Sequence, residues 1–462
     1  MPGLTPFFRA LSCLGLALLI QSLQIYDAAA LDDQPVLTAL NMQILHKELE
    51  IEQNNVTFLM KSHPEGRWKA WRFFAFQEAG TLVLDSGLVV GLTDREHQIK
   101  HHGRISGVLL ENALVLQMVG QLVCAVGDVI ELGLNARQSV MARHQGMDAR
   151  TAKRRAIRLH NELLALLGKR RQLLGGPNGL TPIQVRVAEA ETRVLDDEER
   201  LLWLQCSRTL IDARRLVVSE NSFYVLDIAK NLSGAAGNLV GIESTHLGQP
   251  HVNLHANVLT TVSGGLIMAN PILSRLVGRA AGRSYSDKLD HRYKGEMARA
   301  VEALNVDTAA LKKIGVTNAA PDDQKNRQLF TRVELYAKNQ ENASRYIDAQ
   351  KLLDKKGNNA ALGRIAVGLF AGATKVSSGI CGIIAADGLS ANSGAPLLLG
   401  GTASYTVGAS VIALDNINLN VKRERRVQRE AREGTSTQAV LAKRLAALEE
   451  IDNHLREVEK EF

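Results

Sequence analysis

The chain has 462 residues, enough to bury a sizeable core, and 45% of them are hydrophobic while only 4% are aromatic. Its formal charge of +7 is the difference between 55 basic and 48 acidic residues, which is unlike the concentrated positive charge of nucleic-acid-binding proteins. This composition is typical of helix-rich proteins and predicts no nucleic-acid partner.

The N-terminus carries the pattern of an export signal. Arg9 precedes an uncharged run over residues 10–26, and Ala28, Ala29 and Ala30 then form a small-residue cleavage site. We therefore predict a signal peptide at residues 1–30. The alternative is an uncleaved N-terminal anchor, because the apolar run is near the lower length limit for crossing a bilayer.

An N-terminal helical segment is predicted over residues 31–76, and it ends in a cluster of aromatic and basic side chains. Such side chains favour the headgroup region of a membrane. An equally good interpretation is that the aromatic rings seal the core where this segment meets the next one. The cluster consists of Trp68, Trp71, Phe73, Phe74, Phe76, Arg67, Lys69 and Arg72.

Three segments rich in Gly, Ala, Ser and Leu recur along the chain, and each divides into two arms around a polar turn. They cover residues 77–135, 223–283 and 361–417, and we predict an apolar helical hairpin for each. The likeness is one of pattern, since residue identities align poorly, and chance is the alternative. Small residues spaced for close helix packing are Gly237, Gly241, Gly278, Gly282, Gly368 and Gly372.

Charged helical material follows each predicted hairpin. Residues 136–222 predict an antiparallel coiled-coil hairpin, broken by the glycines of 175–179, with Thr181 and Gln184 forming a capping box that restarts the helix. Its predicted seam is Leu159, Leu163, Leu166, Leu173, Val187, Ala190, Val194, Leu201, Leu204 and Ile211. Residues 284–360 predict shorter charged helices, and residues 418–462 predict a C-terminal amphipathic helix. The expected fold is therefore all-α, with repeated Gly/Ala-rich apolar hairpins alternating with long charged coiled-coil-like helices.

Whether the apolar hairpins enter a membrane decides the function. The uncharged windows 251–274 and 390–414 are long enough to span a bilayer. Against spanning, Asp85, Asp227, Lys230 and Lys375 interrupt the first arms, and an exported protein would place the arginine-rich stretch 137–172 outside. Membrane-spanning hairpins, buried soluble helices, and soluble hairpins that insert on contact with a membrane all stay open.

No sequence motif indicates an enzyme, a cofactor or a small-molecule ligand. Metal-protease, phosphate-loop, dinucleotide and serine-hydrolase patterns are all missing from the sequence. Histidines gather in two predicted hairpin linkers. Few Cys, Asp or Glu residues lie near them to complete a metal site, so we predict solvated side chains. They are His97, His101, His102, His246, His251 and His255.

The sequence predicts an exported, non-enzymatic helical scaffold or partner-binding protein, associated with a membrane of the cell envelope. Its charged helices would bind protein partners or a second copy of the chain. The first alternative is a secreted α-helical protein that inserts into membranes and forms pores. The second is a hydrolase whose site is scattered in sequence.

Overall fold

The computed structural model describes residues 34–62, 67–101, 106–176, 180–247, 250–287, 289, 297–317, 362–387, 391–434 and 436–460. Regular secondary structure in these ranges is entirely α-helical, without a strand, which confirms the all-α class. The predicted signal peptide at 1–30 and most of the charged segment 284–360 lie outside the described residues.

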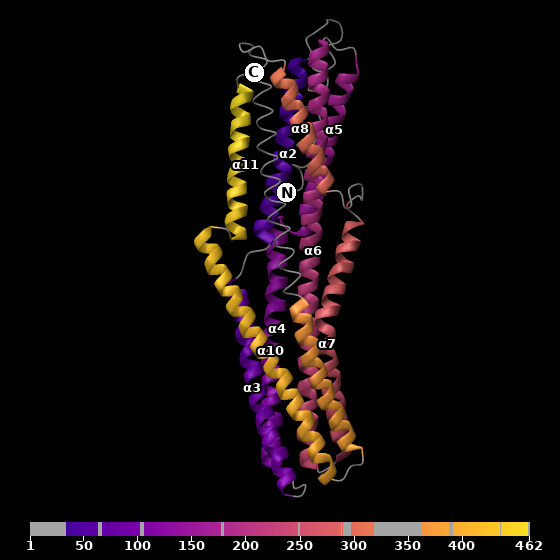
Figure 1. Ribbon diagram of the computed structural model, residues 1–462, viewed down its shortest axis with the longest axis vertical. Coiled ribbons are helices and arrows are strands. Elements are labelled where there is room, and N and C mark those ends of the chain that lie inside the picture. Colours follow the sequence, from indigo (N-terminus) through magenta and orange to yellow (C-terminus); the bar gives the residue numbers. More distant parts are fainter. Residues whose placement is uncertain are drawn as a thin grey trace, which may run out of the picture.

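The helices run roughly along one long axis (Figure 1). In chain order they are α2 (Gln34–Ser62), α3 (Arg67–Lys100), α4 (Gly107–His144), α5 (Ala149–Gly175), α6 (Pro182–Leu247), α7 (Pro250–Ser286), α8 (Met297–Thr317), an unlabelled helix Leu362–Ala386, α10 (Ala391–Glu433) and α11 (Thr437–Lys460).

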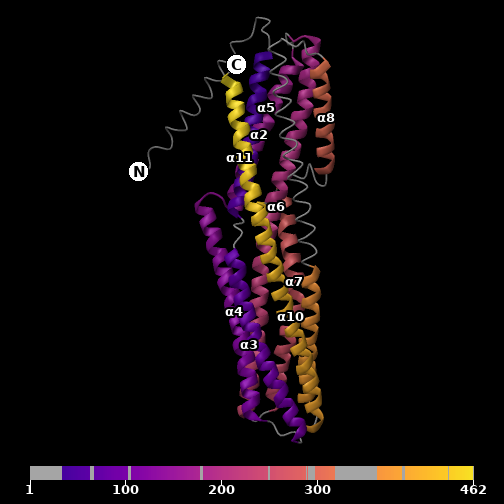
Figure 2. The same cartoon turned by 60° about the vertical axis from the view of Figure 1, so that its left-hand side comes forward.

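The helices gather into two ends of the molecule, which Figures 1 and 2 show from two sides. We call one end the arm, and it holds α2, α5, α8, α11 and the first half of α6. We call the other end the apolar bundle, and it holds α3, α4, α7, α10, the helix Leu362–Ala386 and the second half of α6. Helix α6, with 66 residues, passes through both ends.

Local signals in the sequence explain where α6 begins. The backbone nitrogen of Thr181 donates to Oε1 of Gln184 at 2.7 Å, and the backbone nitrogen of Gln184 donates to Oγ1 of Thr181 at 3.3 Å. This is the reciprocal capping box predicted from the sequence. Pro182 occupies the first helical position, where its missing N–H leaves no hydrogen bond unmade.

The arm is held together by an aliphatic core that α2, α5, α6, α8 and α11 share. The predicted seam residues lie in this core or against it, except Ile211, which packs against the neighbouring cluster around Trp203 and Cys206. Fully buried members include Leu163 of α5, Val194 of α6 and Leu311 of α8. The seam therefore faces several helices and not α5 and α6 alone.

A buried arginine links three helices of the arm. Arg170 of α5 is fully buried, and its Nε donates to Oδ1 of Asn41 on α2 at 2.6 Å. One of its terminal nitrogens donates to the carbonyl of Ala188 and to Oε2 of Glu191, both on α6. Asn41 in turn donates to Glu191 at 2.7 Å. These directional bonds set how α2, α5 and α6 align along their lengths.

The apolar bundle is a closed ring of helices. Helix α3 packs on α4, α4 on α6, α6 on α7, and α10 returns to α3. The helix Leu362–Ala386 completes the ring between α7 and α10. On one side, a Cβ added to Gly264 of α7 would lie 2.7 Å from the backbone nitrogen of Val376. On the other, a Cβ added to Gly401 of α10 would lie 3.0 Å from Cβ of Cys381.

Candidate functional site

Two carboxylates are buried between the helices of the apolar bundle. Asp128 of α4 is fully buried, and its Oδ1 accepts a hydrogen bond from Nε2 of Gln77 on α3 at 3.1 Å. Nδ2 of Asn231 on α6 donates to Oδ2 of Asp128 at 3.4 Å. It also donates to Oδ2 of Asp227, which lies one turn away on α6, at 3.3 Å. Asn231 therefore bridges the two carboxylates, and the network joins three helices.

Asp227 has charged and neutral partners on two helices. Nζ of Lys230 lies 2.7 Å from its Oδ1, and Nδ2 of Asn270 on α7 donates to the same oxygen at 3.0 Å. Burying a charge in an apolar environment is costly unless it is paired and hydrogen-bonded. Asp227 meets both conditions, so the bundle accommodates this carboxylate without exposing it to the surroundings.

Lys375 extends the network to the helix Leu362–Ala386. Its side chain is 3% exposed, and Nζ donates to Oγ of Ser263 on α7 at 2.8 Å. Ser263 donates to the backbone carbonyl of Lys230, and the ammonium group of Lys375 lies 4.9 Å from the ring centroid of Tyr405 on α10. Within the described part of the chain, Lys375 forms no ion pair with a carboxylate.

The outer surface of the bundle is apolar. Branched aliphatic side chains and one phenylalanine are exposed along its helices, while the charges described above face inward. Five helices of the described chain are long and apolar enough to cross a membrane. Exposed apolar residues of the bundle include Leu82, Val89, Val119, Leu122, Val126, Val129, Val225, Leu232, Leu239, Val258, Val262, Leu369, Phe370, Ile380, Ile384 and Val407.

The small residues singled out in the sequence lie at helix contacts. A Cβ added to Gly237 would lie 2.9 Å from the carbonyl oxygen of Ala256, and one added to Gly278 would lie 2.9 Å from that of Arg215. A Cβ added to Gly372 would lie 2.8 Å from the carbonyl oxygen of Gly264 on α7. Gly368 faces Pro271, Gly241 faces Leu114, and Gly282 faces Arg215. Their missing side chains let the helices of the ring approach each other.

The aromatic residues of the predicted interface cluster divide into an exposed and an inward-facing group. Trp68 is 82% exposed and Trp71 is 41% exposed, with the ring of Phe74 edge-on to Trp71. Phe73 instead packs on Phe223 and Tyr224. Phe76 covers Gly127 of α4. The two tryptophans have the exposure that an interfacial location needs, and Phe73 and Phe76 seal helix contacts.

The basic residues of that cluster are engaged in ion pairs where the structure describes them. Arg72 forms a bidentate pair with the buried carboxylate of Glu131, with nitrogen–oxygen distances of 2.6 and 3.1 Å. Lys69 pairs with Glu220 at 2.5 Å and donates to Asn135 at 2.9 Å. The side chain of Arg67 lies outside the described residues.

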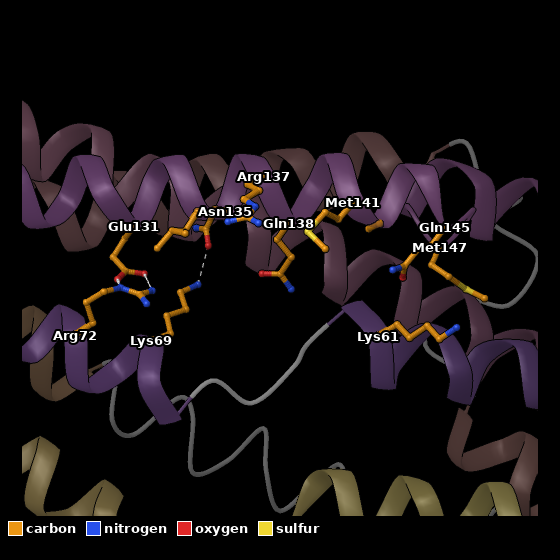
Figure 3. A pocket seen from close by; sticks show the side chains of 12 residues that line it. Lys61, Lys69, Arg72, Glu131, Asn135, Arg137, Gln138, Met141, Gln145 and Met147 are labelled. Carbon is orange, nitrogen blue, oxygen red and sulfur yellow. Dashed lines mark hydrogen bonds and ion pairs between the residues drawn. The ribbon is translucent and has the colours of Figure 1, made fainter.

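A pocket of about 420 Å³ lies where the arm meets the apolar bundle, beside these ion pairs (Figure 3). Four cationic side chains line it, and Met141 and Met147 add an apolar wall. Figure 3 shows Arg72 directed toward Glu131 and Lys69 toward Asn135. The four cations are Lys61, Lys69, Arg72 and Arg137.

The histidines predicted to be solvated linker residues do not assemble a metal site in the described ranges. No group of three His, Cys, Asp or Glu side chains with metal-binding geometry occurs there. The ring centroids of His97 and His101 lie 4.2 Å apart with the ring planes tilted by 42°, and Nε2 of His246 lies 3.5 Å from Oε1 of Glu111. Residue His102 and the side chain of His251 lie outside the described residues.

Comparison with known protein families, curated proteins and solved structures finds no match to this chain. Sequence reasoning missed the buried network as a site, because Asp227, Lys230 and Lys375 counted there only as costs against membrane insertion. These charged residues could have indicated the site, because an ionisable residue inside an apolar membrane helix marks a functional position by default.

Proposed function

We propose that the protein is an integral membrane protein in which the apolar bundle is embedded in the bilayer and the arm projects from it as a scaffold for protein partners. The observation that carries this proposal is the inverted polarity of the bundle, with charges inside and aliphatic side chains outside. A soluble protein rarely exposes large continuous apolar surfaces.

The bundle meets the specific demands of a lipid environment. Its backbone groups are hydrogen-bonded within helices, as spanning segments require. Asp227 is paired with Lys230 and faces the ring interior, where ionisable residues of membrane proteins are normally found. Glycines such as Gly264 and Gly372 bring helices together, which supports association where water provides no driving force.

The finer parts of the proposal rest on the sequence together with this arrangement. The signal pattern at 1–30 supports export to the cell envelope. Three helix pairs, α3 with α4, the second half of α6 with α7, and Leu362–Ala386 with α10, support an internal repeat of apolar hairpins. The charged helices of the arm support coiled-coil pairing with partners. The exposure of Trp68 and Trp71 supports an interfacial belt at the end of the bundle nearest the arm.

Extraction of membranes with alkaline carbonate tests embedding. The full-length protein should stay in the membrane pellet, whereas a protein held by surface charges is released. Recovery in the supernatant would refute embedding. If the purified protein is instead a soluble monomer that releases dye from liposomes, the pore-forming alternative replaces the scaffold.

Labelling with a membrane-impermeant maleimide tests the position of the arm. In a background lacking the native cysteines, Lys100→Cys reports on the far end of α3, and Gln428→Cys reports on the end of α10 nearest the arm. We expect the two sites to be labelled from opposite sides of sealed vesicles. Labelling of both from one side would contradict a spanning bundle.

A further inference from the structure

Four arginines meet where α6, α7 and the helix Leu362–Ala386 approach the arm. Arg215 lies on α6 against Gly278 and Gly282 of α7, since a Cβ added to Gly282 would lie 3.5 Å from Cβ of Arg215. Arg275 and Arg279 flank Gly278 on α7.

The fourth arginine comes from a helix distant in sequence. Gly368 contacts Pro271, with 3.2 Å between an added Cβ and Cγ of the proline. Arg364 and Arg275 each lie one helical turn from this contact, on the side nearer the arm. We call Arg215, Arg275, Arg279 and Arg364 the arginine cluster.

The arginine cluster has no counter-charge in the described part of the chain. None of its members forms an ion pair with a described carboxylate, and Arg279, Arg215 and Arg364 are the charged groups that act on Arg275. Like charges held close together repel and destabilise the protein that holds them. A bound anion would relieve that repulsion.

Apolar side chains lie directly beside the arginine cluster on α7. Ile272, Leu273, Leu276 and Val277 are between 37% and 51% exposed and belong to the outer surface of the bundle. The combination of guanidinium groups with an exposed aliphatic surface matches a ligand that has an anionic head and hydrocarbon chains.

We propose that the arginine cluster binds the phosphate of an anionic phospholipid, with the acyl chains lying against the exposed aliphatic residues of α7. Guanidinium groups bind phosphate oxygens through paired N–H donors, which makes arginine well suited to this group. Basic sites at the ends of membrane helices bind anionic headgroups in this way. The inference rests on the proposed membrane embedding and adds a ligand class to it.

The test uses the full-length protein purified in a neutral detergent. Phosphatidylglycerol or phosphatidylcholine is added, and binding is measured by native mass spectrometry together with the midpoint of thermal unfolding. Each arginine near a phosphate contributes roughly fivefold to affinity. We therefore expect the Arg275→Gln/Arg279→Gln double variant to lose roughly 25-fold in affinity for phosphatidylglycerol, with binding of phosphatidylcholine unchanged.

The matched control is Arg425→Gln/Arg429→Gln, which removes the same charge at the same spacing near the arm end of α10. It should bind phosphatidylglycerol like the unaltered protein. Without anionic lipid, the Arg275→Gln/Arg279→Gln variant should unfold at a higher temperature than the unaltered protein because repulsion is reduced. A misfolded double variant would unfold at a lower temperature. In that case phosphatidylglycerol binding is measured on the single variant Arg364→Gln, which should lose roughly fivefold in affinity.

Equal binding of the two lipids by the unaltered protein would overturn the inference, as would unchanged phosphatidylglycerol binding in the double variant. Inorganic phosphate is the third ligand tested. Stabilisation by inorganic phosphate equal to that by phosphatidylglycerol would identify a soluble anion as the ligand and overturn the lipid assignment. Carbonate extraction separates the two proposals, because a protein that stays in the membrane but shows no lipid preference refutes only this inference.

Discussion

The ammonium nitrogen of Lys375 lies 2.8 Å from the hydroxyl oxygen of Ser263, inside a ring of apolar helices and without a described carboxylate partner. Lys230 has the opposite environment in the same network, because its ammonium group pairs directly with Asp227. Loss of Lys230 would therefore leave a buried carboxylate without its cation, whereas loss of Lys375 would leave only a serine hydroxyl without its donor.

Replacing Lys230 by methionine should destabilise the bundle strongly. The substitution keeps the length of the side chain but leaves Asp227 with amide donors only, and breaking a buried ion pair from one side costs about 3–5 kcal/mol. Thermal unfolding in detergent micelles measures this loss. Lys375→Met is the control and should change stability by less than about 1 kcal/mol, because no carboxylate loses its partner. Equal losses in the two variants would contradict the difference between the two lysine environments.

Two adjacent glycines on α7 should respond oppositely to the same substitution. A Cβ on Gly264 would lie 2.7 Å from the backbone nitrogen of Val376, whereas a Cβ on Gly265 would meet no atom of another helix within 4 Å. Gly264→Ala should therefore destabilise the bundle by about 1–3 kcal/mol through overpacking. Gly265→Ala should stabilise it by up to about 1 kcal/mol, because alanine is the better helix former. Unfolding midpoints in micelles distinguish the two, and a neutral Gly264→Ala would contradict the close helix contact.

The arm should depend on Arg170. Its removal leaves the buried Glu191 without its cationic partner, so we expect Arg170→Met to destabilise the arm by about 3–5 kcal/mol. Hydrogen exchange should then accelerate in α2, α5 and the first half of α6 while the bundle stays protected. Arg171→Met is the control, since Arg171 pairs with Asp196 at the surface, where an ion pair contributes about 0–1 kcal/mol. Similar exchange in the two variants would contradict a structural role for Arg170.

The arm should become less stable as the pH rises. Burial and contact with Asp307 raise the pKa of Asp197 to about 6, and burial together with Glu198 and Glu199 raises the pKa of Glu48. Because the folded arm favours the protonated carboxyls, their contribution to stability is complete below the ordinary carboxyl pKa of about 4 and is lost as the pH rises through about 6. The free energy of opening in the arm, obtained from hydrogen exchange after correction for the intrinsic exchange rate at each pH, should be lower at pH ~8 than at pH ~5.

Asp197→Asn should reduce this pH dependence, because the amide stays neutral throughout the range. Glu449→Gln on the exposed face of α11 is the control and should leave the dependence unchanged. An arm that is more stable at the higher pH would contradict the assignment.

The sequence allowed prediction of features that depend on neighbouring residues. The capping box of Thr181 and Gln184 is an example, because its partners are three residues apart and their preference is local. The all-α class follows from helical periodicity for the same reason. Helix α6, however, continues without interruption across the predicted boundary at residues 222 and 223, where no glycine or proline stops it.

The candidate site depends on residues far apart in the chain, which periodicity does not reveal. Gln77 and Asp128 lie 51 positions apart, and Ser263 and Lys375 lie 112 apart. Only the ring arrangement of the helices brings them together. The sequence shows that Asp227 and Lys230 interrupt an apolar helix and that Asn231 lies one turn from Asp227. The amide donor from Asn270, however, reaches Asp227 only once α6 and α7 are packed.

Helix α6 has a mechanical consequence. At 66 residues it is a rod of roughly 100 Å, with Arg170 hydrogen-bonded to it near one end and Lys230 on it near the other. In the proposed membrane arrangement, a change in the tilt of this rod would move the far tip of the arm sideways, so that a change in local bilayer thickness would displace a partner bound there.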